Sequence, residues 1–203
     1  LEEDSSQFLK ALYKSTANFA GKFRNEDPTL LDVKGVLPHL QKLFEALSDP
    51  QSITFHELLA DYAWGYLAEA CAAAAEADDI GSDRELLEFL KHVLLLASDH
   101  RLPEGSEDVE SNFDDFPSWS FPFTRGEAGK GLVRLARFEF GASSDALDRI
   151  KYLSSSDAVP AVRFHVNTRL VALYETARDL MWEILEKICA EERSSGVLNL
   201  FID

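Results

Sequence analysis

The 203-residue sequence predicts an all-α protein built from stacked antiparallel helical hairpins. Three observations support this fold class. Apolar residues recur with the helical period of about 3.6 in almost every segment, and no sustained two-residue alternation suggests a strand. Residues from about 124 to the end repeat themselves at a fixed offset of 38. Apolar residues make up 46% of the chain, which is enough for a packed core.

The N-terminal region, residues 1–100, is predicted to be wholly helical. A first helix over residues 5–23 places large apolar residues on one stripe: Phe8, Leu12, Phe19 and Phe23. Asp27-Pro28 signals the start of the next helix, and Pro38 kinks or restarts it.

Three capping-box patterns then predict helix starts at Thr54–Glu57, Ser82–Glu85 and Thr124–Glu127. The first helix runs to about Ala77 and ends in a run of alanines that permits close helix approach. The second is very apolar, ends near Ser98 and is expected to be buried on more than one side. The third runs to about Phe140 and is followed by helices at 144–153, 159–176 and 179–192.

Residues 101–123 break the helical pattern and are predicted to form an acidic and aromatic connection. Its aromatic residues either pack on the protein's own helices, which we favour, or dock into a partner. The candidate partner-binding residues are Phe113, Phe116, Trp119, Phe121 and Phe123. The acids from Glu107 to Asp115 are expected to be exposed or disordered, and Trp119 to pack on the helices.

The repeat is the most specific signal. At the offset of 38, Arg125 aligns with Arg163, and three leucine or isoleucine pairs follow: Leu132 with Leu170, Leu135 with Leu173, and Ile150 with Ile188. Each unit is a helical hairpin that cannot bury its apolar face alone, so neighbouring units are expected to stack. Val197 falls on Val159, so residues 197–203 are expected to begin a further, truncated unit that packs on the helix at 179–192 or on another molecule.

Residues 156–163 resemble the start of a HEAT repeat, through Asp157, Pro160, Val162 and Arg163. The proline is displaced from the position directly after the aspartate. The resemblance covers residues 124–203 well and implies a HEAT-like α-solenoid that serves as an interaction scaffold in a larger protein. It also implies that the early arginine of each unit pairs with an acid of a neighbouring turn.

The formal net charge of −16 excludes most nucleic-acid binders and argues against an anionic membrane surface as partner. The negative charge is concentrated in residues 1–110, which hold 22 acids and 9 bases. With two cysteines, Cys71 and Cys189, both on apolar stripes, no disulfide framework is visible. We therefore expect a cytoplasmic protein without a membrane span.

No catalytic, cofactor-binding or metal-binding residue is predicted. His56-Glu57 lacks the second histidine that a zinc protease motif needs at residue 60. His92, Asp99 and His100 are interpreted as helix-end or surface residues.

The predicted function is therefore a non-catalytic interaction or scaffold region that binds a protein partner. Self-association through the C-terminal end is a further expectation. The alternative is a regulatory or sensor segment of a multidomain NTPase or nuclease.

Overall fold

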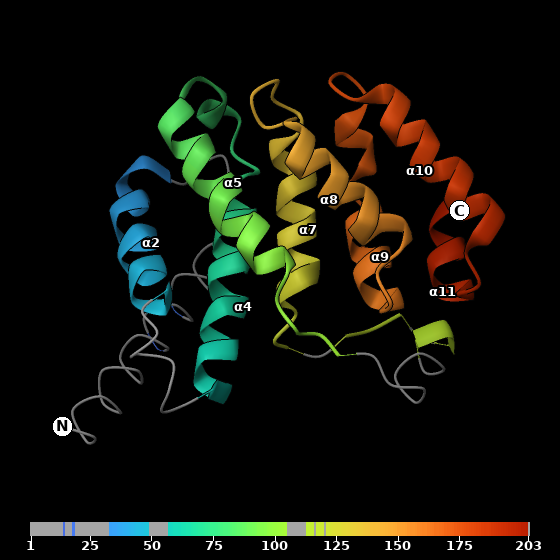
Figure 1. The fold of residues 1–203 in the computed structure, drawn as a ribbon, viewed down its shortest axis with the longest axis horizontal. Coiled ribbons are helices and arrows are strands. Elements are labelled where there is room, and N and C mark those ends of the chain that lie inside the picture. The colour runs from blue at the N-terminus through green and yellow to red at the C-terminus, as the bar shows by residue number, and fades with distance from the viewer. Residues whose placement is uncertain are drawn as a thin grey trace.

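The computed structural model describes residues 14, 18, 33–48, 57–104, 113–115, 117–119 and 121–202 (Figure 1). Within these residues every regular element is a helix, so the all-α prediction is confirmed for this part of the chain. The predicted helix at 5–23, residues 54–56 of the first capping box and the candidate residue Phe116 lie wholly or almost wholly outside the described residues.

The α-helices follow one another in the order α2 (Val33–Ser48), α4 (Glu57–Ala74), α5 (Arg84–Ser98), α7 (Thr124–Leu135), α8 (Ser144–Ser155), α9 (Pro160–Asn167), α10 (Arg178–Glu191) and α11 (Ser195–Leu198). Short 3-10 helices join them: η2 (Asp78–Ser82), η3 (Leu170–Leu173) and η4 (Asn199–Phe201). None of the helices in the described residues combines the length and apolar character needed to cross a bilayer.

The helices pack in two layers that follow the chain order. In one layer α4 packs on α7, α7 on α9, and α9 on α11. In the other layer α5 contacts α8, and α8 contacts α10 (Figure 1). Helix α2 packs on α4 and α5. Each helix therefore lies against its hairpin partner and against the equivalent helix of the next pair.

Small residues allow α4, α7 and α9 to approach closely, as the alanine run predicted. Ala72 of α4 is fully buried, and a Cβ added to Gly131 of α7 would lie 3.0 Å from its Cα. On the other side of α7, a Cβ on Gly129 would lie 2.4 Å from a methyl group of Val166 in α9.

One hydrophobic core joins all of these helices. It extends from Leu40 of α2 through Leu67 and Leu132 to Val197 of α11. All four leucines that the repeat predicted to be core residues are buried: Leu132, Leu135, Leu170 and Leu173. The regions 1–100 and 124–203 consequently share a continuous core, because α4 and α5 both pack on α7.

Two predicted helix ends are wrong. Helix α7 stops at Leu135 instead of Phe140, because the chain folds back so that Gly141 lies against the carbonyl of Leu135. The helix predicted over 159–176 divides into α9 and η3. At this break the hydroxyl of Thr168 donates to the carbonyl of His165 at 2.7 Å, and such local bonds compete with the helical pattern.

Two capping assignments also need correction. The N-cap of α5 is Asp83, not Ser82, and its carboxylate accepts from the backbone N–H of Leu86 at 3.1 Å. Thr124 lies inside α7 instead of capping it, because the Glu127 carboxylate is committed to side chains on other turns.

Candidate functional site

A chain of ion pairs connects the loops that precede the helices of the first layer. Arg125, in the first turn of α7, binds both carboxylate oxygens of Asp157 at 2.9 and 3.1 Å. Its third nitrogen donates to the carbonyls of His100 and Arg101 at 3.1 and 2.7 Å. One guanidinium thus ties the end of α5 to the start of α9.

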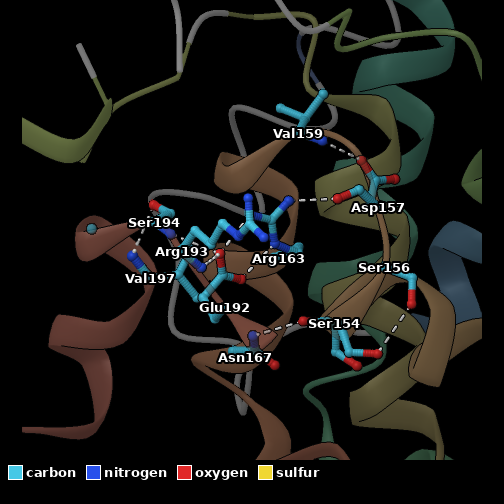
Figure 2. Close-up of polar contacts among 12 residues, drawn as sticks. Ser154, Ser156, Asp157, Val159, Arg163, Asn167, Glu192, Arg193, Ser194 and Val197 are labelled. Carbon is cyan, nitrogen blue, oxygen red and sulfur yellow. Dashed lines mark hydrogen bonds and ion pairs between the residues drawn. The ribbon is translucent and has the colours of Figure 1, made fainter. Parts of the chain in front are cut away.

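Arg163 repeats this arrangement one unit further on (Figure 2). It binds both carboxylate oxygens of Glu192 at 2.7 Å and donates to the carbonyl of Asp157 at 2.6 Å. Burial alone raises the pKa of Glu192, but hydrogen bonds from Arg163 and from the backbone of Ser194 outweigh it and lower the pKa. The expected pairing of the early arginines with acids is confirmed, so the acids satisfy guanidinium groups that could otherwise bind an external anion.

The same chain begins at Asp61 of α4, which is buried. His100 lies 3.2 Å from one of its carboxylate oxygens, and Arg101 binds the other. Burial lowers the pKa of His100, although the charge of Asp61 opposes that effect. His100 is therefore a structural residue at the end of α5, in agreement with its interpretation as a helix-end histidine.

The aromatic connection folds back onto the protein's own helices. Phe113 is buried against Gly196 of α11 and lies 5.6 Å from the ring of Phe164. Phe121 lies 4.2 Å from the ring of Tyr66 in α4. Phe123, at the start of α7, is buried and stacks on Trp119 at 5.1 Å. Phe113 and Phe123 thus serve internal packing, the alternative favoured from the sequence.

Trp119 is packed on one face and open on the other. Its ring lies 4.8 Å from His165 and 6.1 Å from Phe164, both in α9, as the sequence predicted. Its side chain nevertheless remains 39% exposed. Among the described candidate residues, Trp119 keeps the surface that a partner could contact.

One acid of the connection is structural, contrary to the expectation that these acids face solvent. Asp114 accepts hydrogen bonds from the hydroxyl of Ser194 at 2.5 Å and from the backbone N–H of Gly196 at 3.2 Å. It thereby caps α11, which packs mainly on α9 and not on the helix at 179–192 as expected. Asp115 is exposed. Glu107, Asp108 and Glu110 lie outside the described residues.

Beneath Trp119 lies a cluster of charges that the sequence analysis missed. The Glu127 carboxylate is 3.1 Å from Nε2 of His165 and 2.5 Å from Nζ of Lys130. Burial alone raises the pKa of Glu127, but the hydrogen bond with His165 and the charge of Lys130 outweigh it and lower the pKa to about 2. The offset of 38 between Glu127 and His165 was the signal that could have paired them.

A shallow groove separates α5 from α8, and sequence analysis did not identify it. Two large apolar side chains stay exposed in its walls, Leu96 of α5 and Tyr152 of α8, each with 46% exposure. His92, Leu95 and Ser98 line the α5 side. A second hollow that shares Asp99, Arg149 and Tyr152 continues the groove toward the chain of ion pairs.

The charged residues of this groove are mostly acidic. Asp99, Asp145 and Asp148 line it together with a single base, Arg149. The Arg149 guanidinium is already engaged, because it lies 2.7 Å from the carboxylate of Asp99 and donates to the hydroxyl of Ser98 at 2.8 Å. A hydrogen bond from Ser143 lowers the pKa of Asp145, so this acid is charged at neutral pH. The groove thus combines apolar contacts with net negative charge.

The two cysteines differ in environment. Cys71 is fully buried, and burial raises the pKa of its thiol, so it is a core residue as predicted. Cys189, also predicted to face the core, is exposed on α10. Among the described residues no three His, Cys, Asp or Glu side chains converge as metal ligands would.

Comparison of the sequence and structure with protein-family models, curated proteins and solved structures gave no match.

Proposed function

We propose that this chain is a non-catalytic scaffold of the HEAT-like α-solenoid type, and that it binds a protein partner along the groove between α5 and α8. Two features support the repeat assignment. The helices pack with their neighbours in chain order, and Arg125 and Arg163 make the same kind of bidentate contact 38 residues apart. In stacked helical units each repeat contacts mainly its neighbours, which is the arrangement of α7, α8, α9 and α10.

The observation that carries the proposed binding function is the exposure of Leu96 and Tyr152 in one groove. Both sit on regular helices whose remaining apolar residues are largely buried. Tyrosine and leucine side chains on rigid helices supply apolar contact area with little loss of conformational entropy on binding.

The acids around this pair define the chemistry of the partner. Asp99, Asp145 and Asp148 favour a segment in which an apolar anchor is flanked by Lys or Arg. The net charge of −16 would steer such a basic segment toward the protein, and the effect should weaken with salt.

A displayed library of random peptides, selected on the purified chain, tests this function. We expect enriched peptides that carry an aromatic or aliphatic residue beside two or more Lys or Arg residues. Fluorescence anisotropy should show at least a tenfold loss of affinity for the double variant Tyr152→Ala, Asp148→Lys. It should also show weaker binding as the salt concentration rises.

Trp182→Ala is the matched control, because Trp182 is an aromatic residue of similar exposure, 52%, on a different helix. It should bind the selected peptides as the wild type does. Selection of acidic peptides, or equal binding to the groove variant and the wild type, would exclude the groove as the partner site.

A further inference from the structure

A second apolar surface lies at the end of the array formed by α10 and α11 (Figure 1). The repeat offers an internal comparison for it. Val133 and Val171 are equivalent at the offset of 38, yet Val133 is fully buried and Val171 is 77% exposed. In the preceding unit α9 and η3 pack on α7, and the hydroxyl of Thr176 donates to the carbonyl of Ala136 at 2.5 Å. The described residues contain no such cover for Val171.

The side-chain pattern of α10 shows which of its faces is open. Met181, Ile184 and Ile188 are buried against the protein. Glu183 reaches α8 by pairing with Lys151 at 2.5 Å. Helical geometry then directs Trp182 and Cys189, seven residues apart, away from α8. Both are exposed, Trp182 at 52%.

Helix η4 adds further apolar residues at the same end. Phe201 is 40% exposed and its neighbour Ile202 is 77% exposed. Together with Val171 and Trp182 they form what we call the end face. Exposed apolar residues concentrated in this way mark an interaction surface more often than scattered ones do.

We propose that the end face binds the end face of a second copy of this chain, forming a two-fold symmetric dimer. The distribution of charge favours this occupant. Residues 111–203 hold 14 acids and 11 bases, whereas residues 1–110 hold 22 acids and 9 bases. Two copies that meet through the C-terminal end therefore place their strongly acidic halves furthest apart.

The neighbours of the end face are consistent with self-contact. Glu183 is neutralised by Lys151, and Arg178 lies over the ring of Tyr174 at 4.1 Å. An isologous contact pairs one patch with itself, so a mostly apolar patch with few unpaired charges satisfies it without a complementary second surface.

Sedimentation velocity over a range of protein concentrations tests the dimer. The mass of the wild type should rise from 22.7 kDa toward twice that value. The double variant Val171→Asp, Trp182→Glu should stay at the monomer mass and keep its helical circular dichroism. Tyr152→Glu, which alters an exposed aromatic of the α5–α8 groove, is the control and should dimerise as the wild type does.

A spin label on Cys189 gives an independent measurement, because the other cysteine, Cys71, is buried. In the dimer, two labels on the end faces should show dipolar coupling that the Val171→Asp, Trp182→Glu variant loses. A wild type that stays monomeric at all concentrations would overturn the proposal. So would undiminished dimerisation of the double variant. Neither result bears on the peptide-binding groove, which lies on other helices.

Discussion

Glu127 and His165 occupy equivalent positions in consecutive units, and their side chains lie 3.1 Å apart. The contact joins the first turn of α7 to α9 beneath the ring of Trp119, which lies 4.8 Å from His165. The repeat therefore brings together two residues of opposite charge character at the same helical position. The interface between the two units is polar at this point and apolar elsewhere.

The low pKa of Glu127 predicts that the protein loses stability in acid. The carboxyl has a pKa of about 2 when folded, below its usual value of 4.5, so its contribution is fully present above pH 4.5. As the pH falls from about 4.5 toward 2, up to about 3 kcal/mol should be lost. Urea unfolding at several pH values measures this loss. Glu127→Gln should flatten the pH dependence in this window, and an unchanged slope would contradict the assignment.

The same carboxylate should matter at neutral pH. Glu127→Gln leaves Lys130 and His165, both largely buried, without an anion and should cost about 3 kcal/mol. The matched control is Glu183→Gln, which breaks the exposed pair with Lys151 and should cost less than about 1 kcal/mol. Similar losses in both variants would mean that the buried cluster contributes no more than a surface pair.

The sequence predicted the helices well because each buries one stripe at the helical period. It also predicted the arginine pairs, since Arg125 and Arg163 recur at the repeat offset. It placed the ends of α7 and α9 incorrectly, because those ends depend on contacts with other elements, such as that of Thr176 with the carbonyl of Ala136. Local patterns do not encode such contacts.

The candidate site was harder to predict for the same reason. Leu96 and Tyr152 are 56 positions apart in the sequence, and each lies within an ordinary amphipathic pattern. Only the packing of α5 beside α8 brings them into one groove. The aromatic connection attracted attention through composition alone, yet Phe113 and Phe123 are buried by internal packing.

The ladder of arginines should tolerate little change. Arg163→Ala removes a bidentate pair with Glu192, whose side chain is only 5% exposed, and should cost about 3–5 kcal/mol. Arg163→Lys should recover less than half of that, because an ammonium group cannot make both contacts and also reach the carbonyl of Asp157. Arg178→Ala, at an exposed position, serves as the control in the same thermal or urea unfolding series.

Two neighbouring residues of η3 should respond differently to truncation. Leu170 is 4% exposed and Val171 is 77% exposed. Leu170→Ala should cost about 2–5 kcal/mol, whereas Val171→Ala should stay within about 0.5 kcal/mol for the monomer. Unfolding by urea at low protein concentration, where any dimer is dissociated, measures both. A large effect of Val171→Ala under these conditions would show that this position is covered within one chain.

The close approach of α4 and α7 should make Gly131 intolerant of even one methyl group. Its Cβ would lie 3.0 Å from the Cα of Ala72, a backbone atom, and 2.8 Å from a methyl group of Leu94. Alanine is favoured over glycine by about 1 kcal/mol in an open helix, so intrinsic propensity predicts a more stable variant. We expect the opposite, a loss of about 1–3 kcal/mol for Gly131→Ala, because Leu94 can shift but the backbone of α4 cannot do so without disturbing its buried alanines. The sign of the change in urea unfolding decides the matter: a stabilised variant would mean that the two helices are further apart than this packing requires.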